Sequence, residues 1–225
     1  MEFDEAVDKA PPGWRHFTLE DVARLPAEVR AHEMARVPPG ESGERIVRGL
    51  FWTLVYHLDA GRWDELARHE PIARELIDSL PDRVDAALDV GAGSGRLTQH
   101  LVPRATRVVA VEPSDPLRAL LAARYPTVHA VSGWAEALPF TAGTFQLTAA
   151  GGAFGPDPTV LAELRRVTSP GGVIALISPE HPEWFEVQGW SRIVAPPASV
   201  PEHPRWLDEF FGPLDPPREL VMTAV

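Results

Sequence analysis

The sequence predicts an α/β fold, a doubly wound domain with a mostly parallel sheet and an N-terminal helical cap. Three observations lead to this prediction. Short apolar runs of strand length alternate with helical stretches from Val84 onward, a glycine-rich turn follows the first run, and the chain before Val84 shows helical periodicity alone. Such alternation is typical of parallel sheets with right-handed crossovers.

The chain before the first strand is expected to be helical. Thr18 and Asp21 have the spacing of a capping box. Apolar and aromatic side chains recur at steps of three and four residues from Glu41 to Leu58, which predicts one amphipathic helix. A further helix is expected over Arg62 to Leu80, kinked or restarted at Pro71.

Five short apolar runs then predict the buried strands of a parallel sheet. They are Ala86–Val90, Arg107–Val111, Val128–Val131, Phe145–Ala150 and Gly172–Ile177. The segments between them are long enough for helices of roughly ten residues. After Ser178 prolines are frequent, and the remaining signals are a short helix near 205–211 and one β-like run, Glu219 to Val225.

Composition excludes several partners and chemistries. The 225 residues are 44% hydrophobic and carry a formal net charge of −11, so the chain can bury a core and repels phosphate backbones and anionic lipid. We therefore expect a small-molecule partner, no nucleic acid and no membrane. Cysteine is absent and no His/Asp/Glu cluster has ligand spacing, so no metal is expected. The acidic N-terminus and the lack of a long apolar run predict a cytoplasmic location.

The strongest local signal is a glycine turn after the first strand, in the run Leu88-Asp-Val-Gly-Ala-Gly-Ser-Gly-Arg-Leu97. Glycines at 91, 93 and 95 let the backbone turn sharply and approach a ligand. A helix starting close to Gly95 would direct its free N–H groups toward the same ligand. The spacing differs from the dinucleotide motif G-x-G-x-x-G, and no Lys-Ser/Thr pair forms a phosphate loop. The turn therefore favours a ligand without a pyrophosphate.

A carboxylate follows the second predicted strand. Glu112 lies 112 − 93 = 19 positions after Gly93, the distance at which a βαβ unit delivers an acid to ribose hydroxyls. One carboxylate can accept hydrogen bonds from two neighbouring hydroxyl groups. Each feature alone also fits a solvated loop, but turn, strand, spacing and acid together predict a nucleoside-binding site.

Five segments, in this order along the chain, carry a resemblance to a known family. They are Leu88–Gly95, Val111–Ser114, Gly133–Phe140, Phe145–Phe154 and Leu164–Gly172. In combination they resemble the class I S-adenosylmethionine-dependent methyltransferases, and within them the small-molecule, UbiE-like or type 11 group. The resemblance implies a Rossmann-like core, S-adenosyl-L-methionine as cofactor and S-adenosyl-L-homocysteine as product.

The resemblance assigns the methionine end of the cofactor to the glycine turn. The backbone of Gly91, Ala92 and Gly93 would hold the methionine part, Asp89 would lie near its ammonium group, and Gly151 would lie beside the sulfonium. S-adenosylmethionine contains a zwitterionic amino acid and a ribose but no phosphate. A turn without a phosphate-binding lysine agrees with that chemistry.

The nucleoside end is assigned to the two following loops. Glu112 would take the ribose hydroxyls, while Pro113 and the pair Trp134-Ala135 would border the adenine. Trp134 stands where relatives usually place an acid that bonds the adenine amino group. Adenine would therefore be held by ring contact and by the backbone of Ala135.

Two further departures from the family pattern concern catalysis and the end of the sheet. Gln146 replaces a usual Asp, and Phe154-Gly155-Pro156 replaces an aromatic-His-Trp pattern, so a frequent site for a catalytic histidine is empty. The resemblance also implies a final antiparallel strand pair, of which only Glu219 to Val225 is evident. Either the sheet is shortened and its edge covered by the N-terminal helices or another subunit, or Trp184 to Val194 hides a strand, or the chain is truncated.

These features divide the chain into three predicted domains. A helical cap or lid covers residues 1–81, the S-adenosylmethionine-binding Rossmann-like core covers 82–180, and a proline-rich segment that completes the sheet covers 181–225.

Methyl transfer from a sulfonium is an in-line displacement with a neutral leaving group, so alignment and exclusion of water can supply most of the acceleration. A hydroxyl or phenol acceptor would be helped by a base, and the predicted catalytic residues are His57 and His181. His181 follows the fifth strand at the carboxyl edge of the sheet, where ligands bind. His57 lies in the aromatic helical segment, which fits both a lid and core packing. His129, on the third strand, is expected in a core or loop role.

The sequence thus predicts S-adenosylmethionine-dependent methyl transfer to a small organic acceptor, with O-, N- and C-methylation all open. One alternative is a catalytically silent methyltransferase-like protein with a cofactor-binding or regulatory role, which the missing histidine and the short C-terminus motivate. A nicotinamide-dependent oxidoreductase is a second, which the glycine spacing disfavours. A homodimer is also left open.

Overall fold

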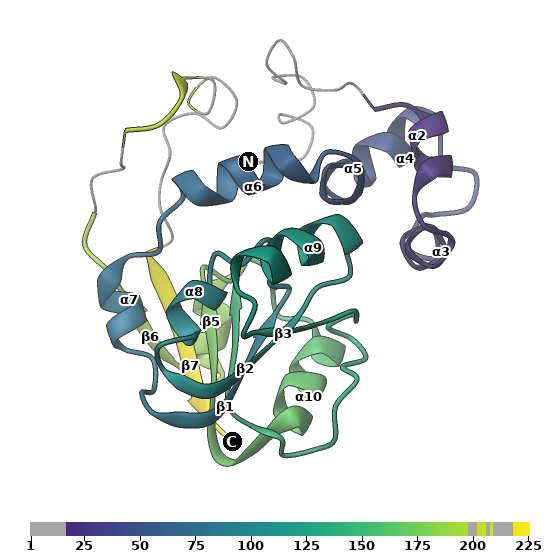
Figure 1. Cartoon of the computed structure of the whole chain (residues 1–225). Helices are drawn as coiled ribbons and strands as arrows, with labels where there is room; N and C mark the ends of the chain where they lie inside the picture. Colours follow the sequence, from purple (N-terminus) through teal and green to yellow (C-terminus); the bar gives the residue numbers. More distant parts are fainter. Residues whose placement is uncertain (1–16, 198–201, 206–207, 209–217) are drawn as a thin grey trace. The chain divides into compact units, whose positions relative to one another are not determined.

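The structure is a computed structural model that describes residues 17–197, 202–205, 208 and 218–225 (Figure 1). The described residues form two compact units. A helical unit contains 17–69, 202–205 and 208, and a sheet unit contains 70–197 and 218–225. The sheet unit thus begins at Glu70, earlier than the predicted boundary after residue 81.

The helical unit shows why its residues form short helices. Its helices are α2 (Leu19–Arg24), α3 (Ala27–Met34), α4 (Gly43–Gly49), α5 (Phe51–Leu58) and α6 (Ala60–His69). The predicted capping box is present, with Asp21 Oδ2 accepting from the Thr18 N–H at 3.0 Å. The single helix predicted over 41–58 is wrong. The chain leaves helical geometry at Leu50, where ψ is 9°, and two helices form instead of one.

The helical unit has its own apolar core. Val22, Leu25, Leu50 and Leu54 pack together there. Tyr56 on α5 meets Trp63 on α6 edge to face, with ring centroids 4.8 Å apart. Core packing therefore accounts for the apolar face of α5.

The sheet unit contains seven strands in the order β3-β2-β1-β4-β5-β7-β6. The strands are β1 (Val84–Val90), β2 (Ala105–Val111), β3 (His129–Val131), β4 (Phe145–Gly151), β5 (Thr168–Ile177), β6 (Ser191–Val194) and β7 (Glu219–Ala224). Strands β1 to β5 pair in parallel, whereas β7 pairs antiparallel with β5 and with β6. The predicted α/β class with a mostly parallel sheet is confirmed.

The C-terminal strand pair is complete, because β6 is the strand hidden between 184 and 194. Its four residues begin with Ser191 and Arg192, so the run is too short and too polar to be recognised from alternation. The sheet is therefore not shortened. The helix predicted near 205–211 lies for the most part outside the described residues.

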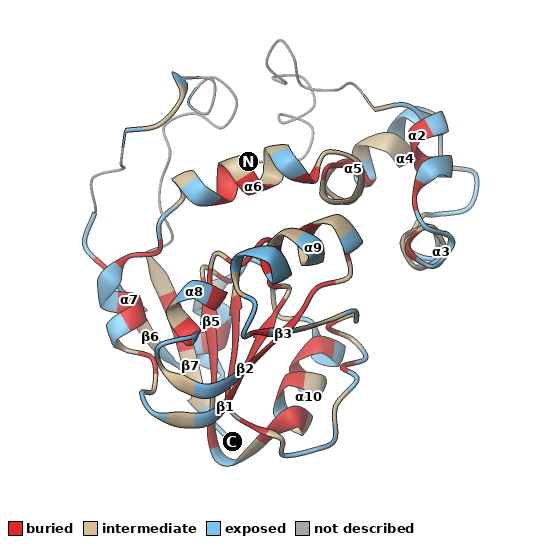
Figure 2. Cartoon of the chain, viewed as in Figure 1, coloured by how far each residue is buried: buried red, intermediate tan, exposed pale blue. Residues whose placement is uncertain are grey.

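Five helices of the sheet unit cover its two faces in separate apolar clusters (Figure 1). They are α7 (Arg74–Asp78), α8 (Thr98–Leu101), α9 (Asp115–Arg124), α10 (Pro158–Val167) and α11 (Pro182–Val187). The first three pack on one face through Leu76, Leu101 and Leu121, and the last two on the other through Leu164 and Phe185. The strands between them are largely buried (Figure 2). Because α7 contributes to this core, it belongs to the sheet unit.

The strands alternate between these two clusters. On β1, Leu88 and Val90 join the cluster of α10, while Ala87 joins the cluster of α8. Asp89 has the parity of Ala87, so its side chain points to the face that carries α8. Across the described part of the chain, no helix has the length and apolarity needed to cross a bilayer.

Candidate functional site

The candidate site lies at the carboxyl ends of β1, β2 and β4. Strand β1 is central, with β2 on one side and β4 on the other. The chain leaves β1 toward β2 and leaves β4 toward β5, so the strand order reverses between β1 and β4. Open α/β sheets bind ligands at this switch point.

The glycine turn follows β1 directly and is fixed to the end of β2. The N–H groups of Gly91 and Ala92 both donate to the Val111 carbonyl, at 2.9 and 3.0 Å. Gly91 and Gly93 have φ values of +68° and +56°, which glycine adopts without strain. The turn continues further than predicted, since α8 begins at Thr98 rather than close to the third glycine.

The third glycine of the turn serves packing. A Cβ on Gly95 would lie 2.6 Å from the ring of Tyr125, the residue that ends α9. Arg124, in the last turn of α9, donates to the Ser94 carbonyl at 3.0 Å. The turn is therefore held from α9 as well as from β2.

Asp89 is a buried carboxyl group beneath the turn. Its side chain is almost fully enclosed, with 1% of the residue exposed. Oδ2 accepts a hydrogen bond from the Thr98 hydroxyl at 2.6 Å, whereas Oδ1, which is also buried, has no hydrogen-bond partner among the described residues. Burial raises the pKa of Asp89 to about 7, against the opposing hydrogen bond from Thr98. An incoming cation would satisfy this oxygen.

Glu112 is a second buried carboxylate and binds the turn itself. Its Oε2 accepts from the Gly93 N–H and its Oε1 from the Ser114 N–H, each at 2.8 Å. Burial raises the pKa of Glu112, while these two hydrogen bonds act in the opposite direction. Each carboxylate oxygen retains a further lone pair for a hydroxyl donor. The predicted spacing from Gly93 thus places the acid in direct contact with the turn.

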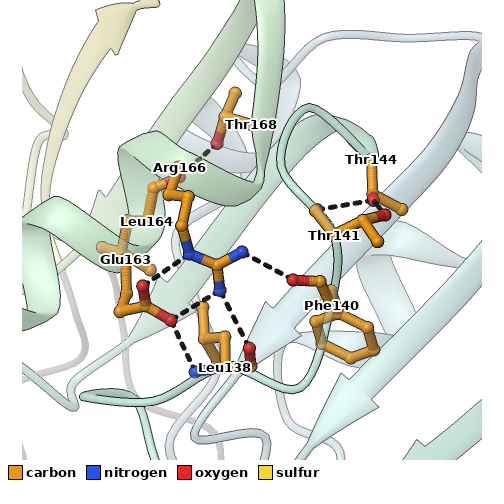
Figure 3. A network of polar contacts seen from close by, with 8 residues as sticks. All are labelled: Leu138, Phe140, Thr141, Thr144, Glu163, Leu164, Arg166 and Thr168. Atoms are coloured by element: carbon orange, nitrogen blue, oxygen red, sulfur yellow. Dashed lines mark hydrogen bonds and ion pairs between the residues drawn. The ribbon is translucent and has the colours of Figure 1, made fainter.

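Trp134 and Ala135 lie on the loop after β3, and the far end of this loop is anchored to α10. Trp134 pairs with Ala137 in an isolated bridge, and Ala135 is buried. Figure 3 shows the anchor: the Arg166 guanidinium donates to the carbonyls of Leu138 and Phe140 and to the Glu163 carboxylate.

Glu163 completes this anchor by accepting from the Leu138 N–H at 2.7 Å. The hydrogen bond from Arg166 lowers the pKa of Glu163, and the same contact raises the pKa of Arg166. Each charge of this pair has a partner within the protein, so the network acts as a structural clamp on the loop.

Arg96 reaches across the switch point and was missed by sequence reasoning. It directly follows the third glycine, and its Nη2 donates to the carbonyl of Gly151 at the end of β4, at 3.3 Å. Its Nη1 lies 2.6 Å from Oε2 of Glu70. The signal that could have identified Arg96 is its place as the first cation after the turn.

The departures at Gln146 and Phe154 have structural explanations. Gln146 lies near the start of β4, and its Oε1 accepts from the Ala86 N–H on β1 at 2.8 Å. It therefore links two strands at the amino end of the sheet, opposite the candidate site. The ring of Phe154 would lie 3.5 Å from a Cβ on Gly91, so this side chain packs against the turn.

The histidines named as catalytic lie in different units. His181 follows β5, precedes α11 and is exposed, with Nδ1 3.4 Å from Oε1 of Glu183. His57 lies on α5 in the helical unit. His129 is exposed on the edge strand β3. Within the described residues no group of three acidic or histidine side chains is arranged to hold a metal ion.

Comparison with known proteins gives the family of this site. Residues 87–172 match the family model of a methyltransferase domain. An uncharacterised methyltransferase of Mycobacterium tuberculosis is 36% identical over 121 residues, which are 52% of this chain and 49% of that protein. A demethylmenaquinone methyltransferase of Beutenbergia cavernae is 29% identical over 145 residues, 57% of this chain and 60% of that protein. The chain thus spans about half the length of the curated relatives it matches.

The fold is also found among solved structures. One chain of a Haloferax volcanii complex, between a methyltransferase activator and a protein assigned as a methyltransferase, matches with a TM-score of 0.52 at 18% identity. The match covers 74% of this chain and 95% of that chain. At this identity the likeness concerns the fold.

Fold and site therefore define a Rossmann-like α/β domain of the methyltransferase kind. More narrowly, the chain carries a class I S-adenosylmethionine-dependent methyltransferase domain, with the matched residues 87–172 at its centre. The family prediction is confirmed at this level.

Proposed function

We propose that this protein transfers a methyl group from S-adenosyl-L-methionine to a small organic acceptor and leaves S-adenosyl-L-homocysteine as product. The observation that carries the proposal is the pairing of two buried carboxyl groups with one glycine turn. Asp89 Oδ1 is buried and unpartnered among the described residues, and Glu112 contacts the Gly93 N–H from the neighbouring strand. An ammonium group and a pair of ribose hydroxyls match these two acceptors.

In this proposal the turn and the carboxyl groups divide the cofactor between them. The backbone of 91–93 holds the methionine part with Asp89 at its ammonium, and Gly151 borders the sulfonium. The bound cofactor supplies an electrophilic methyl group. Because Asp89 is buried and water is excluded around it, its negative charge acts in a medium of low polarity.

Glu112 takes the ribose hydroxyls through the lone pairs that its backbone contacts leave open. Pro113, which follows β2, then borders the adenine together with Trp134 and Ala135. The latter two lie on the loop after β3, whose far end is fixed by the clamp of Glu163 and Arg166. Ring contact with Trp134 replaces the acid that relatives usually offer to adenine.

We further propose that the acceptor lies at the carboxyl edge of the sheet, where His181 can accept a proton from a hydroxyl acceptor. Its ring is exposed, and Nδ1 lies 3.4 Å from Oε1 of Glu183. His57 is proposed for the same role from the helical unit, which we propose as a cap or lid. Replacement of either histidine by glutamine should lower kcat and leave cofactor affinity unchanged.

Calorimetric titration with S-adenosyl-L-homocysteine tests the cofactor assignment. The wild-type protein should bind it saturably, and Glu112→Ala should weaken binding by about 2 to 4 kcal/mol, because two hydrogen bonds to a charged group are lost. Glu163→Ala is the matched control, since Glu163 is also a carboxylate that accepts a backbone N–H, but in the structural clamp. It should change affinity by no more than about threefold.

Three results would contradict the proposal. The first is the absence of binding by the wild-type protein, and the second is equal loss in the two variants. The third is binding of NADH in competition with S-adenosyl-L-homocysteine, which would favour a nicotinamide-dependent oxidoreductase. Methyl transfer itself is measured by incubating the protein with S-adenosyl-L-methionine and acceptor panels and following a mass increase of one methyl group.

A further inference from the structure

Arg96 places a positive charge at the switch point, where it acts on Asp89, the carboxyl group proposed to bind the ammonium group of the cofactor. Its side chain is 14% exposed, and its Nη2 atom would lie only 2.9 Å from a Cβ on Gly152. The guanidinium therefore occupies the space directly beside the end of β4. It extends there from the glycine turn after β1, so one side chain bridges the two strands between which the order reverses.

The anion bound to Arg96 is a carboxylate from this chain. Glu70, the first residue of the sheet unit, places Oε2 at 2.6 Å from Nη1, and its side chain is 24% exposed. A half-enclosed arginine at a ligand-binding edge, already holding a carboxylate, shows that the position accepts a carboxylate group.

The chemistry of an α-amino acid connects this pair to Asp89. The ammonium and the carboxylate of an amino acid are attached to the same carbon, so a site that binds one must meet the other a few ångström away. Arg96 is the cation whose charge acts on Asp89, lowering a pKa that burial raises. Arg118, which also borders the site, instead donates to the Glu112 carbonyl at 2.6 Å and pairs with Asp115.

We propose that Arg96 binds the carboxylate of the cofactor's amino-acid part, and that Glu70 holds this position in the free protein and is displaced when the cofactor binds. Asp89 and Arg96 together then recognise both charges of the zwitterion. Glu70 acts as an internal competitor that keeps the guanidinium oriented and lowers the apparent affinity. This inference rests on the proposed function.

Two ligands make it possible to test the role of Arg96 separately from cofactor binding itself. S-adenosyl-L-homocysteine contains the amino-acid part, whereas 5′-methylthioadenosine has the same nucleoside and sulfur without it. Calorimetry with both ligands on Arg96→Met should show a loss of about 10- to 100-fold for S-adenosyl-L-homocysteine and no change for 5′-methylthioadenosine. Because both are measured on one variant, partial loss of fold would lower both affinities together and cannot imitate this result.

Arg104 supplies the matched control. Its side chain is also 14% exposed, and it is paired with Asp78 and Asp82 near the start of β2, at the opposite end of the sheet. Arg104→Met should leave the affinity ratio of the two ligands as in the wild type. Glu70→Gln should raise the affinity for S-adenosyl-L-homocysteine about three- to tenfold and leave 5′-methylthioadenosine unchanged.

The outcomes are distinct. An unchanged ligand ratio in Arg96→Met overturns the role of Arg96, and an equal or weaker affinity in Glu70→Gln overturns the displacement of Glu70. If Arg96→Met does not fold, Arg96→Lys replaces it in the test. Lysine retains the charge without the planar fork of arginine, so the affinity ratio of the two ligands should lie between that of the wild type and that expected for Arg96→Met. Failure of the wild type to bind either ligand would instead overturn the proposed function.

Discussion

The two ends of the sheet carry buried or half-buried carboxyl groups in opposite electrostatic situations. At the carboxyl end, burial raises the pKa of Asp89 to about 7, and one of its oxygens has no partner among the described residues. Toward the amino end, the hydrogen bond from Arg166 lowers the pKa of Glu163, whose oxygens also accept the Leu138 N–H. Both oxygens of Glu163 thus accept hydrogen bonds, whereas Asp89 has one oxygen without a hydrogen-bond partner among the described residues.

This difference distinguishes a binding group from a structural one. A carboxylate held by an arginine and a backbone N–H stabilises the protein as it stands. A buried carboxyl with an open oxygen reduces stability when ionised, and it gains its missing interaction only when a cation arrives. The following predictions test whether the contrast between Asp89 and Glu163 has this meaning.

The largest effect is expected from Gly93→Val, because a branched side chain would enter the space proposed for the cofactor and disfavours the positive φ of that position. Affinity for S-adenosyl-L-homocysteine should fall by about 100-fold or more. Gly171→Val is the matched control: Gly171 also has a positive φ, of +79°, nothing lies within 4 Å of its Cβ position, and it belongs to β5 at the other end of the sheet. Retention of binding in Gly93→Val would remove the turn from the site.

A smaller effect is expected from Asp89→Asn. Loss of the charge should weaken S-adenosyl-L-homocysteine binding about 10- to 100-fold at pH 8, as expected for a hydrogen bond to an ionised group. Calorimetry at several pH values should show wild-type affinity falling as the pH drops below about 7, because the protonated carboxyl cannot pair with the ammonium. The variant should lose this dependence.

Asp89→Asn should also stabilise the free protein, in contrast to its effect on binding. The folded-state pKa is raised from 3.8 to about 7, so the native state binds the proton more tightly and wild-type stability increases as the pH falls through that interval. At pH 8 the substitution should raise the free energy of unfolding by up to about 4 kcal/mol. Urea unfolding at pH 8 and pH 5 measures this, and a destabilised variant at pH 8 would mean that Asp89 is structural.

Periodicity and spacing predicted the parts of this molecule that are determined by the local sequence pattern. The parallel strands follow from apolar runs, and Glu112 follows from its distance to Gly93. The break at Leu50 and the short strand β6 were not predictable in this way, because packing and pairing with β7 decide them.

Arg96 was missed for a related reason. Its partners Glu70 and Gly151 lie 26 and 55 positions away in the sequence, and only the fold brings them to one switch point. Local sequence patterns identify the turn, but they contain no information about which distant carboxylate faces it.

The smallest effect on binding is expected from Glu163→Gln, which tests the structural side of the contrast. S-adenosyl-L-homocysteine affinity should stay within about threefold of the wild type, while the free energy of unfolding at pH 7 falls by about 1 kcal/mol through weaker bonding to Arg166. Because the folded-state pKa of Glu163 is lowered from its ordinary 4.5, its contribution is complete above that pH and disappears as the pH falls below it. Urea unfolding should therefore show wild type and variant converging at acidic pH because the Glu163 contribution is lost, whereas the Asp89 carboxyl group makes the wild type more stable as the pH falls. A strong loss of binding with unchanged stability would instead make Glu163 part of the ligand site, and the distinction between the two ends of the sheet would fail.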